Sequence, residues 1–269
     1  MTKITKSMYE LRYFDEAAQK DTVIHRLNSL VKLTVSIFYV LAVVSYGKYE
    51  IVSMLPMVIY PVLVFNLGDL EFLQVFKRLL PMLPVILLLG VSNPILDRET
   101  VTVIGNIVVS RGLLSFISLI IKGTLTVICG MLLIATTSVD DLAKALGRLH
   151  VPKIFIIIFL LTYRYTYVLI EEFSNINTSY SLRAPCQKGI HHRLWGPLLG
   201  QLLMRTYDRA QAVYSAMSLR GYRGEYHRGE NFTELSDYAY LILWIAFFTM
   251  VRFNNVPVML GNIMTGVFQ

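Results

Sequence analysis

Apolar residues in this chain gather into long runs separated by short polar stretches, and this patterning narrows the possible folds more than any other feature. The runs lie at Leu30–Tyr46, Ile51–Leu67, Leu80–Leu96, Gly112–Thr136, Ile154–Ile170 and Tyr238–Val251. Most approach the roughly 20 residues that a helix needs to cross a bilayer. With charged residues at only 16%, the chain is too apolar for an ordinary soluble domain. We therefore predict an all-α, polytopic integral membrane protein with about five transmembrane helices.

Prolines and β-branched residues shape the segments within and between these runs. Only Gly47–Glu50 separates the first two runs, so they should form a helical hairpin. Pro56 and Pro61 should kink its second helix, which is tolerated where neighbouring helices satisfy the carbonyls that a proline leaves without a donor. A short amphipathic segment, Asp69–Leu80, should then return the chain to a polar surface. The β-branched stretch Thr100–Val109 is typical of an extended loop rather than of a membrane helix.

Lys122 lies near the middle of the longest run. An ammonium at that depth costs a few kcal/mol on insertion scales, about 2.5–3.5, so it should face the bundle interior or a partner. Two interpretations stay open: Lys122 snorkels or pairs within the bundle, or it serves gating or substrate passage.

The run Ile154–Ile170 decides the topology. If it spans the membrane, residues 171–235 and their many basic side chains lie outside, against the preference of Lys and Arg for cytoplasmic loops. The run also carries Arg164 near its centre among three tyrosines, a composition that suits an interface better than hydrocarbon. We therefore predict that Ile154–Ile170 lies on the cytoplasmic side, under the membrane domain.

Helical periodicity continues well beyond this run. Apolar residues recur at steps of three and four over Pro152–Arg183 and again over Leu198–Arg220, which predicts two long amphipathic helices. The first apolar face contains Phe155, Phe159, Thr162, Tyr165, Leu169, Phe173, Ile176 and Tyr180. The second contains Leu199, Leu203, Thr206, Ala210, Val213 and Met217. Between the helices, Pro185, Gly189, Gly196 and Pro197 indicate a turn.

These segments predict three parts. Residues 1–137 form an N-terminal membrane domain of four spans with a cytoplasmic N-terminus, and residues 138–235 form a cytoplasmic domain of amphipathic helices. Ser138–His150, with acidic residues at its start, should be the first helix of that second domain. Residues 236–269 supply a last span and a tail, and the position of residues 252–269 stays open.

Catalytic and metal-binding patterns are missing from the sequence. There is no G-x-x-x-x-G-K-[ST] phosphate loop and no H-E-x-x-H, G-x-S-x-G or C-x-x-C pattern. Cys129 and Cys186 do not have the spacing of a zinc site, and His191–His192 is better explained as a solvated loop. The net charge of +7 fits cytoplasmic loops rather than nucleic-acid binding. We predict no catalytic site, no metal and no cofactor bound by this chain.

Two similar short elements end the two predicted amphipathic helices. They are Ser181-Leu182-Arg183-Ala184 and Ser218-Leu219-Arg220-Gly221. An Arg at a helix end can enter a partner's groove and bind carboxylates in a bidentate manner. Alternatively, each Arg only complements the negative end of its own helix dipole.

Several motifs resemble the transmembrane (T) component of energy-coupling factor importers, in particular the cobalt-type (CbiQ) branch. Ile24–Asn28 with Val31–Leu33 is similar to H-R-L-D-P-R-x-K-L, although Asn28, Ser29 and Leu30 differ. Leu161–Tyr165 with Glu171–Glu172 resembles L-T-Y-R-Y followed by acids. Ala216–Tyr222 resembles the second A-R-G motif of the family. The first A-R-G motif is weaker, since Leu182 and Ala184 replace Ala and a Gly or Ser.

This resemblance implies a non-catalytic subunit of an ATP-driven importer in the cytoplasmic membrane. Arg183 and Arg220 would each contact one of two cytoplasmic ATPases, which use the ATP, from the ends of two coupling helices. Ser181, Leu182, Ala184, Leu219 and Gly221 would flank these contacts. The membrane part would hold a substrate-binding (S) component, possible forms being CbiM and CbiN. Cobalt or nickel is the implied substrate, and a vitamin stays an alternative.

A self-sufficient secondary transporter is the competing hypothesis. Lys122 and the prolines of the second and third runs motivate it. No matching second half or repeat accompanies these features, so we favour the coupling subunit.

Overall fold

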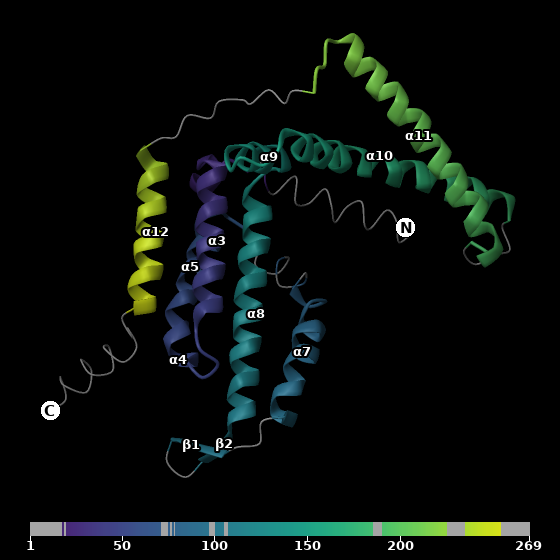
Figure 1. The fold of residues 1–269 in the computed structure, drawn as a ribbon. Coiled ribbons are helices and arrows are strands. Elements are labelled where there is room, and N and C mark those ends of the chain that lie inside the picture. The colour runs from purple at the N-terminus through teal and green to yellow at the C-terminus, as the bar shows by residue number, and fades with distance from the viewer. Residues whose placement is uncertain are drawn as a thin grey trace. The chain divides into compact units, whose positions relative to one another are not determined.

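A computed structural model describes residues 20–70, 79–96, 100–104, 107–184, 190–224 and 235–253, together with residues 18, 75 and 77 (Figure 1). The described residues fall into two compact units. Residues 139–224 make up one unit, and the described residues before 139 and after 234 make up the other. Cys186, half of the predicted segment Asp69–Leu80 and the tail beyond residue 253 lie outside the described residues.

The larger unit is a bundle of apolar helices. Its elements are α2 (Val23–Arg26), α3 (Ser29–Ser45), α4 (Ile51–Met54), η1 (Leu55–Val58), α5 (Ile59–Leu67), α7 (Leu83–Leu96), β1 (Thr100–Ile104), β2 (Ile107–Ser110), α8 (Arg111–Thr136) and α12 (Leu235–Phe253). Helix α3 packs against both α8 and α12, and α5 and α7 also contact α8. Buried aromatic side chains fill the core between α3, α5 and α12: Tyr39, Tyr60, Trp244 and Phe248.

The second unit consists of α9 (Val139–Arg148), α10 (Lys153–Arg183), the short 3-10 helix η2 (His192–Leu194) and α11 (Trp195–Leu219). Helix α10 contacts both α9 and α11. Asp140 and Asp141 lie in the first turn of α9, where carboxylates interact favourably with the helix dipole. His150 has a positive φ of 63°, in the short connection between α9 and α10.

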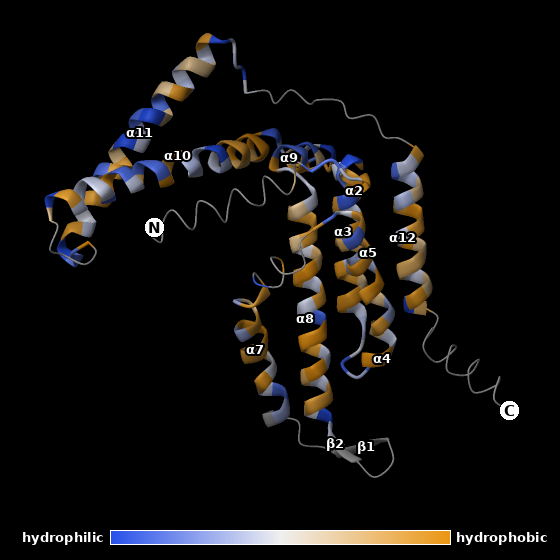
Figure 2. Ribbon diagram, turned by 180° about the vertical axis from the view of Figure 1, so that it is seen from behind, coloured by the Kyte–Doolittle hydropathy of each residue, from blue (hydrophilic) through white to orange (hydrophobic). Residues whose placement is uncertain are grey.

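Helices α8, α10 and α12 are long and apolar enough to cross a membrane, and shorter apolar helices cover Ser29–Ser45, Ile51–Leu67 and Leu83–Pro94. The prediction of an all-α membrane protein is therefore confirmed. Figure 2 shows hydrophobic residues along most of α7 and α8, whereas hydrophilic and hydrophobic residues alternate along α11.

Several predicted boundaries were wrong for local reasons. The stretch Thr100–Val109 is extended and is not a membrane helix, as predicted, but its two strands pair as an antiparallel hairpin in which Thr100 lies opposite Ser110. Helix α11 begins at Trp195, three residues before the predicted start, so Gly196 and Pro197 belong to the helix and not to the turn. Proline is tolerated there because the N–H groups of the first turn have no partner within the helix. Likewise α7 begins at Leu83, after Pro81.

The second apolar run is kinked, as the prolines predicted. It is divided into α4, η1 and α5, with Pro56 in the 3-10 segment and Pro61 within α5. Pro61 has no N–H to donate to the carbonyl of Met57 four residues earlier. The hydroxyl of Tyr39 on α3 donates to that carbonyl at 3.2 Å. A neighbouring helix thus satisfies the group that the proline leaves without its α-helical donor.

Basic side chains from two other helices hold the C-terminal end of α3. Lys122 of α8 donates to the carbonyl of Tyr46 and, at 3.3 Å, to that of Gly47. Arg252 of α12 donates to the side chain and the carbonyl of Ser45 at 3.0 and 3.1 Å. Because the last carbonyls of a helix lack intrahelical donors, these contacts fix the bundle at this end.

Candidate functional site

The two Ser-Leu-Arg elements both lie at the C-terminal ends of helices, one residue apart in their position relative to the helix end. Arg183 is the last residue of α10, and Arg220 is the C-cap residue of α11. Both serines turn back onto their own helix: Ser181 Oγ donates to Thr178 O at 2.8 Å, and Ser218 Oγ donates to Tyr214 O at 2.9 Å. The similarity of the two elements therefore extends from sequence to local geometry.

The Leu and Arg side chains of both elements face solvent. Leu182 is 77% exposed and Leu219 is 90% exposed. Arg183 and Arg220 are exposed as well, and among the described residues neither guanidinium has an ion-pair or hydrogen-bond partner. Each helix end thus presents an apolar side chain next to a guanidinium whose donors are available to a partner.

The two helices terminate differently, which accounts for Gly221 and Ala184. Tyr222 N donates to Met217 O at 2.9 Å and Gly221 N donates to Ser218 O at 3.0 Å, the hydrogen-bond pair of a Schellman motif. Gly221 has a φ of +82°, a conformation that favours glycine. Ala184, in contrast, has a φ of −131°, so the first element does not need glycine.

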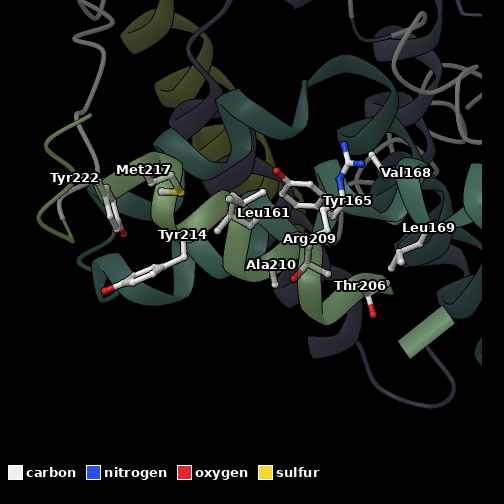
Figure 3. Close-up of a pocket in the computed structure, with 12 residues that line it drawn as sticks. Leu161, Tyr165, Val168, Leu169, Thr206, Arg209, Ala210, Tyr214, Met217 and Tyr222 are labelled. Atoms are coloured by element: carbon white, nitrogen blue, oxygen red, sulfur yellow. The ribbon is translucent and has the colours of Figure 1, made fainter. Parts of the chain in front are cut away.

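A groove of about 420 Å³ lies between α10 and α11 (Figure 3). The side chains that line it are mainly apolar and aromatic: Leu161, Thr162, Tyr165, Val168, Leu169, Thr206, Arg209, Ala210, Val213, Tyr214, Met217 and Tyr222. Part of each predicted apolar face lines this groove: Thr162, Tyr165 and Leu169 of α10, and Thr206, Ala210, Val213 and Met217 of α11. Sequence analysis did not identify the groove itself, because periodicity defines a face but not its partner.

Polar and aromatic contacts join the two helices around the groove. Arg205 of α11 forms an ion pair with Glu172 of α10. The Arg209 guanidinium lies 6.0 Å from the centre of the Tyr165 ring, near the limit for a cation–π contact. Trp195 stacks on Phe173 with ring centroids 6.4 Å apart.

Much of the apolar surface of α10 and α11 remains exposed. Only 6% of the most apolar stretch of α10 is buried, and α11 has no buried residue. Large exposed apolar side chains on α11 are Trp195, Leu199, Leu203, Met204, Tyr207, Tyr214 and Leu219. Exposed apolar surface of this extent indicates a protein partner or a membrane.

The segment with the H-R-L-type motif covers α2 and the start of α3. The Asn28 side chain accepts a hydrogen bond from Leu30 N at 3.1 Å and is therefore the N-cap residue. Asn and Asp serve equally well at this position, so the Asn28 departure from the family pattern preserves the cap. Arg26 pairs with Asp21 at 2.8 Å, and this guanidinium lowers the pKa of the Asp21 carboxyl.

The structure gives no sign of a binding role for the remaining candidate residues that it describes, which are Lys122, His191 and His192. The contacts of Lys122 with the end of α3 favour pairing within the bundle over gating. His191 accepts a hydrogen bond from Arg193 N at 3.4 Å at the start of η2, and His192 is exposed. Within the described part of the chain, no three or more His, Cys, Asp or Glu side chains are grouped so that they could hold a metal ion.

The fold and the two helix ends define a helical membrane protein with a second unit that exposes apolar and basic side chains. Residues 20–230 match the CbiQ family model, described as cobalt transport protein. The chain belongs to the CbiQ family, a family of transport proteins rather than of enzymes, and the resemblance noted in the sequence is confirmed.

Three relatives illustrate the range of this family. An uncharacterized protein of Methanocaldococcus jannaschii is 23% identical over 90% of this chain and 86% of its own length. The nickel permease LarQ of Lactiplantibacillus plantarum is 32% identical over 42% of this chain and 43% of its own length. A putative fused cobalt transport protein, CbiMQ, of Methanocorpusculum labreanum is 27% identical over 41% of this chain and 19% of its own length.

Proposed function

We propose that this chain is the membrane subunit that couples ATP hydrolysis to substrate import. Two cytoplasmic ATPase subunits bind the Ser-Leu-Arg elements of α10 and α11, and their motion passes through these helices to a substrate-binding membrane subunit. The chain crosses the cytoplasmic membrane several times, and its second unit lies on the cytoplasmic side. It performs no catalysis and binds no cofactor, since the partners hydrolyse the ATP.

The observation that carries this proposal is the repeated presentation of an exposed Leu beside an exposed Arg at a helix end. An apolar side chain can fill a partner's pocket while the guanidinium beside it binds a carboxylate through two hydrogen bonds. A role restricted to the helix dipole would need the basic charge but would not need the exposed leucines.

Cobalt or nickel is the substrate that we propose. The family description and the names of the nickel permease and the fused cobalt protein support these ions. The fused relative also supports a CbiM-like protein as the substrate-binding partner, because fusion joins domains that work together. A vitamin importer is the alternative, since the substrate is selected by that partner and not by this chain.

Charge reversal at the two helix ends tests the coupling role. We expect Arg183→Glu and Arg220→Glu each to reduce co-purification of the ATPases at least tenfold, because a repulsive contact replaces an ion pair. Uptake of Co²⁺ or Ni²⁺ by the assembled transporter should fall with it. Arg193→Glu is the matched control, because Arg193 is an exposed arginine of the same unit outside both elements.

Two results would contradict this proposal. If both charge reversals leave co-purification and uptake unchanged, the Arg residues do not bind the ATPases. If the purified chain alone takes up Co²⁺ or Ni²⁺ into proteoliposomes without ATP, a self-sufficient transporter is the better assignment.

A further inference from the structure

The last turn of α8 is held by a buried ammonium from α3. Lys32 is only 5% exposed, and its Nζ donates to the carbonyl of Thr136, the last residue of α8, at 2.7 Å. A second, longer contact of 3.3 Å reaches the carbonyl of His25. Because an ammonium is costly to bury, its position at a helix end with carbonyl acceptors indicates a specific role for this charge.

His25 supports the same turn of α8 from the N-terminal segment. Its Nε2 lies 3.3 Å from the carbonyl of Ala135, and its Nδ1 lies 2.7 Å from Thr22 Oγ1. Both contacts are satisfied when Nε2 carries the proton, since Nδ1 then accepts from the Thr22 hydroxyl. The carbonyls of the last two residues of α8 are thus bound by side chains from outside the helix.

This turn is where the chain leaves the helical bundle. Thr137 has an extended backbone, with φ −137° and ψ 122°, and the second unit begins at Val139 with α9. The last carbonyls of a helix have no intrahelical donor, so the final turn frays unless other groups bind it. Thr137 and Ser138 join α8 directly to α9 along the chain, so a movement of α9 reaches the end of α8 through this connection.

The polar side chains around Lys32 enclose little space. The cavity that they line has a volume of about 10 Å³, barely the space of one water molecule. A hydrated divalent cation is much larger, so a transport role for this cluster is unsupported and a mechanical role remains.

We propose that Lys32 is a positioning residue that makes the end of α8 rigid, so that movement of the second unit is transmitted to the bundle. This inference rests on the coupling function proposed above. With Lys32 in place, α8 and α3 move together, and α12 follows because Asp237 accepts a hydrogen bond from Asn28 N at 2.9 Å. Without the ammonium, the last turn of α8 unwinds or bends when the second unit moves, and the rest of α8 stays in place.

The test compares Lys32→Met with Lys20→Met in the assembled transporter. Lys20 belongs to the same N-terminal region and also donates to a backbone carbonyl, that of Asp69 at 2.7 Å, but this acceptor is exposed and is not part of α8. We expect Lys32→Met to keep ATPase co-purification and ATP hydrolysis, while Co²⁺ uptake per ATP hydrolysed falls at least tenfold. Lys20→Met should leave all three unchanged.

Hydrogen exchange in the purified chain provides a readout that does not depend on the partners. Amides of residues 133–136 should exchange at least tenfold faster in Lys32→Met than in Lys20→Met. If exchange in this turn is unchanged, Lys32 does not make it rigid, and the inference is wrong even if coupling by the two Arg elements is correct. If wild-type complexes show no ATP-dependent uptake, the proposed function fails, and the exchange measurement still judges the role of Lys32.

Two further outcomes separate positioning from general folding. An unchanged ratio of uptake to hydrolysis, or a loss of uptake only in proportion to the amount of assembled complex, overturns the proposal. If Lys32→Met does not assemble, His25→Ala decides, because it removes the side-chain contacts of His25 with Ala135 O and Thr22 Oγ1 and leaves Lys32 in place. We expect that variant to assemble with at least a threefold lower ratio, and an unchanged ratio overturns the inference.

Discussion

The hydrogen bond between Tyr39 and Met57 is the contact that makes the kinked second run compatible with the bundle. Both residues are fully buried, with exposed fractions of 0%. Pro61 removes the α-helical donor for the Met57 carbonyl, and the Tyr39 hydroxyl takes its place at 3.2 Å. We therefore expect Tyr39→Phe to destabilise the bundle only because Pro61 is present.

The expected magnitude follows from the burial. A buried acceptor that loses its donor costs about 1–3 kcal/mol, whereas hydrogen bonds between membrane helices average about 0.6 kcal/mol. Full burial of both partners favours a loss of about 1–2 kcal/mol for Tyr39→Phe. Phenylalanine keeps the ring contact with Tyr60, whose centroid lies 4.8 Å away, so the change reports on the hydroxyl. Pro61→Ala restores a backbone N–H and should reduce that loss.

A double-mutant cycle measures this dependence. The free energy of unfolding is determined in mixed micelles for the wild type, Tyr39→Phe, Pro61→Ala and the double variant. We expect Tyr39→Phe to cost at least about 0.6 kcal/mol less in the Pro61→Ala background. Equal costs in the two backgrounds, within about 0.3 kcal/mol, would show that the hydroxyl does not compensate for the proline.

Two matched glycine comparisons provide the remaining predictions. In α8, a Cβ on Gly123 would lie 3.0 Å from Ile86 of α7, whereas a Cβ on Gly130 would meet nothing within 4 Å. Gly123→Leu should therefore lower the free energy of unfolding by about 1–3 kcal/mol, and Gly130→Leu should not lower it. At the motif ends, Gly221→Ala should cost about 1–2 kcal/mol, because its φ is +82°, and it should weaken ATPase co-purification. Ala184→Gly should leave that co-purification within twofold of wild type, and a larger effect there than at Gly221 would contradict the assignment.

The apolar runs predicted the helices of the bundle well, because hydrocarbon allows only segments that satisfy their own backbone groups. The sequence also predicted a break at Pro56 and a neighbouring helix that satisfies the carbonyl left without a donor by Pro61. What the sequence could not identify is the donor that compensates, since Tyr39 reaches Met57 only because α3 lies beside η1 in the bundle. Helix-end contacts such as that of Lys122 with Tyr46 O are equally non-local.

The elements of the candidate site were visible in the sequence, but their geometry was not. The sequence alone could not explain why the first element has Ala184 where the second has Gly221. The backbone explains it: α11 ends in a turn with a positive φ at Gly221, whereas φ at Ala184, after α10, is negative. The groove between α10 and α11 could not be predicted either, because each apolar face could equally have packed on α9 or on a partner.

Hydropathy alone cannot decide where α10 lies, because the helix is apolar enough to cross a membrane. The contacts of α10 with α11 provide evidence on this point that the periodicity of the sequence does not contain. Arg205 and Arg209 of α11 pair with Glu172 and Tyr165 of α10, close to the middle of that helix. If α10 spanned the bilayer, these guanidinium groups would be drawn toward the hydrocarbon, where each costs about 2.5–3.5 kcal/mol or more. Arg164 near the centre of the apolar run would add a similar cost. A position beside the membrane avoids the cost of placing these guanidinium groups in hydrocarbon. It also leaves the apolar side chains of α10 and α11 available to protein partners, which supports the coupling function over a fifth crossing by this segment.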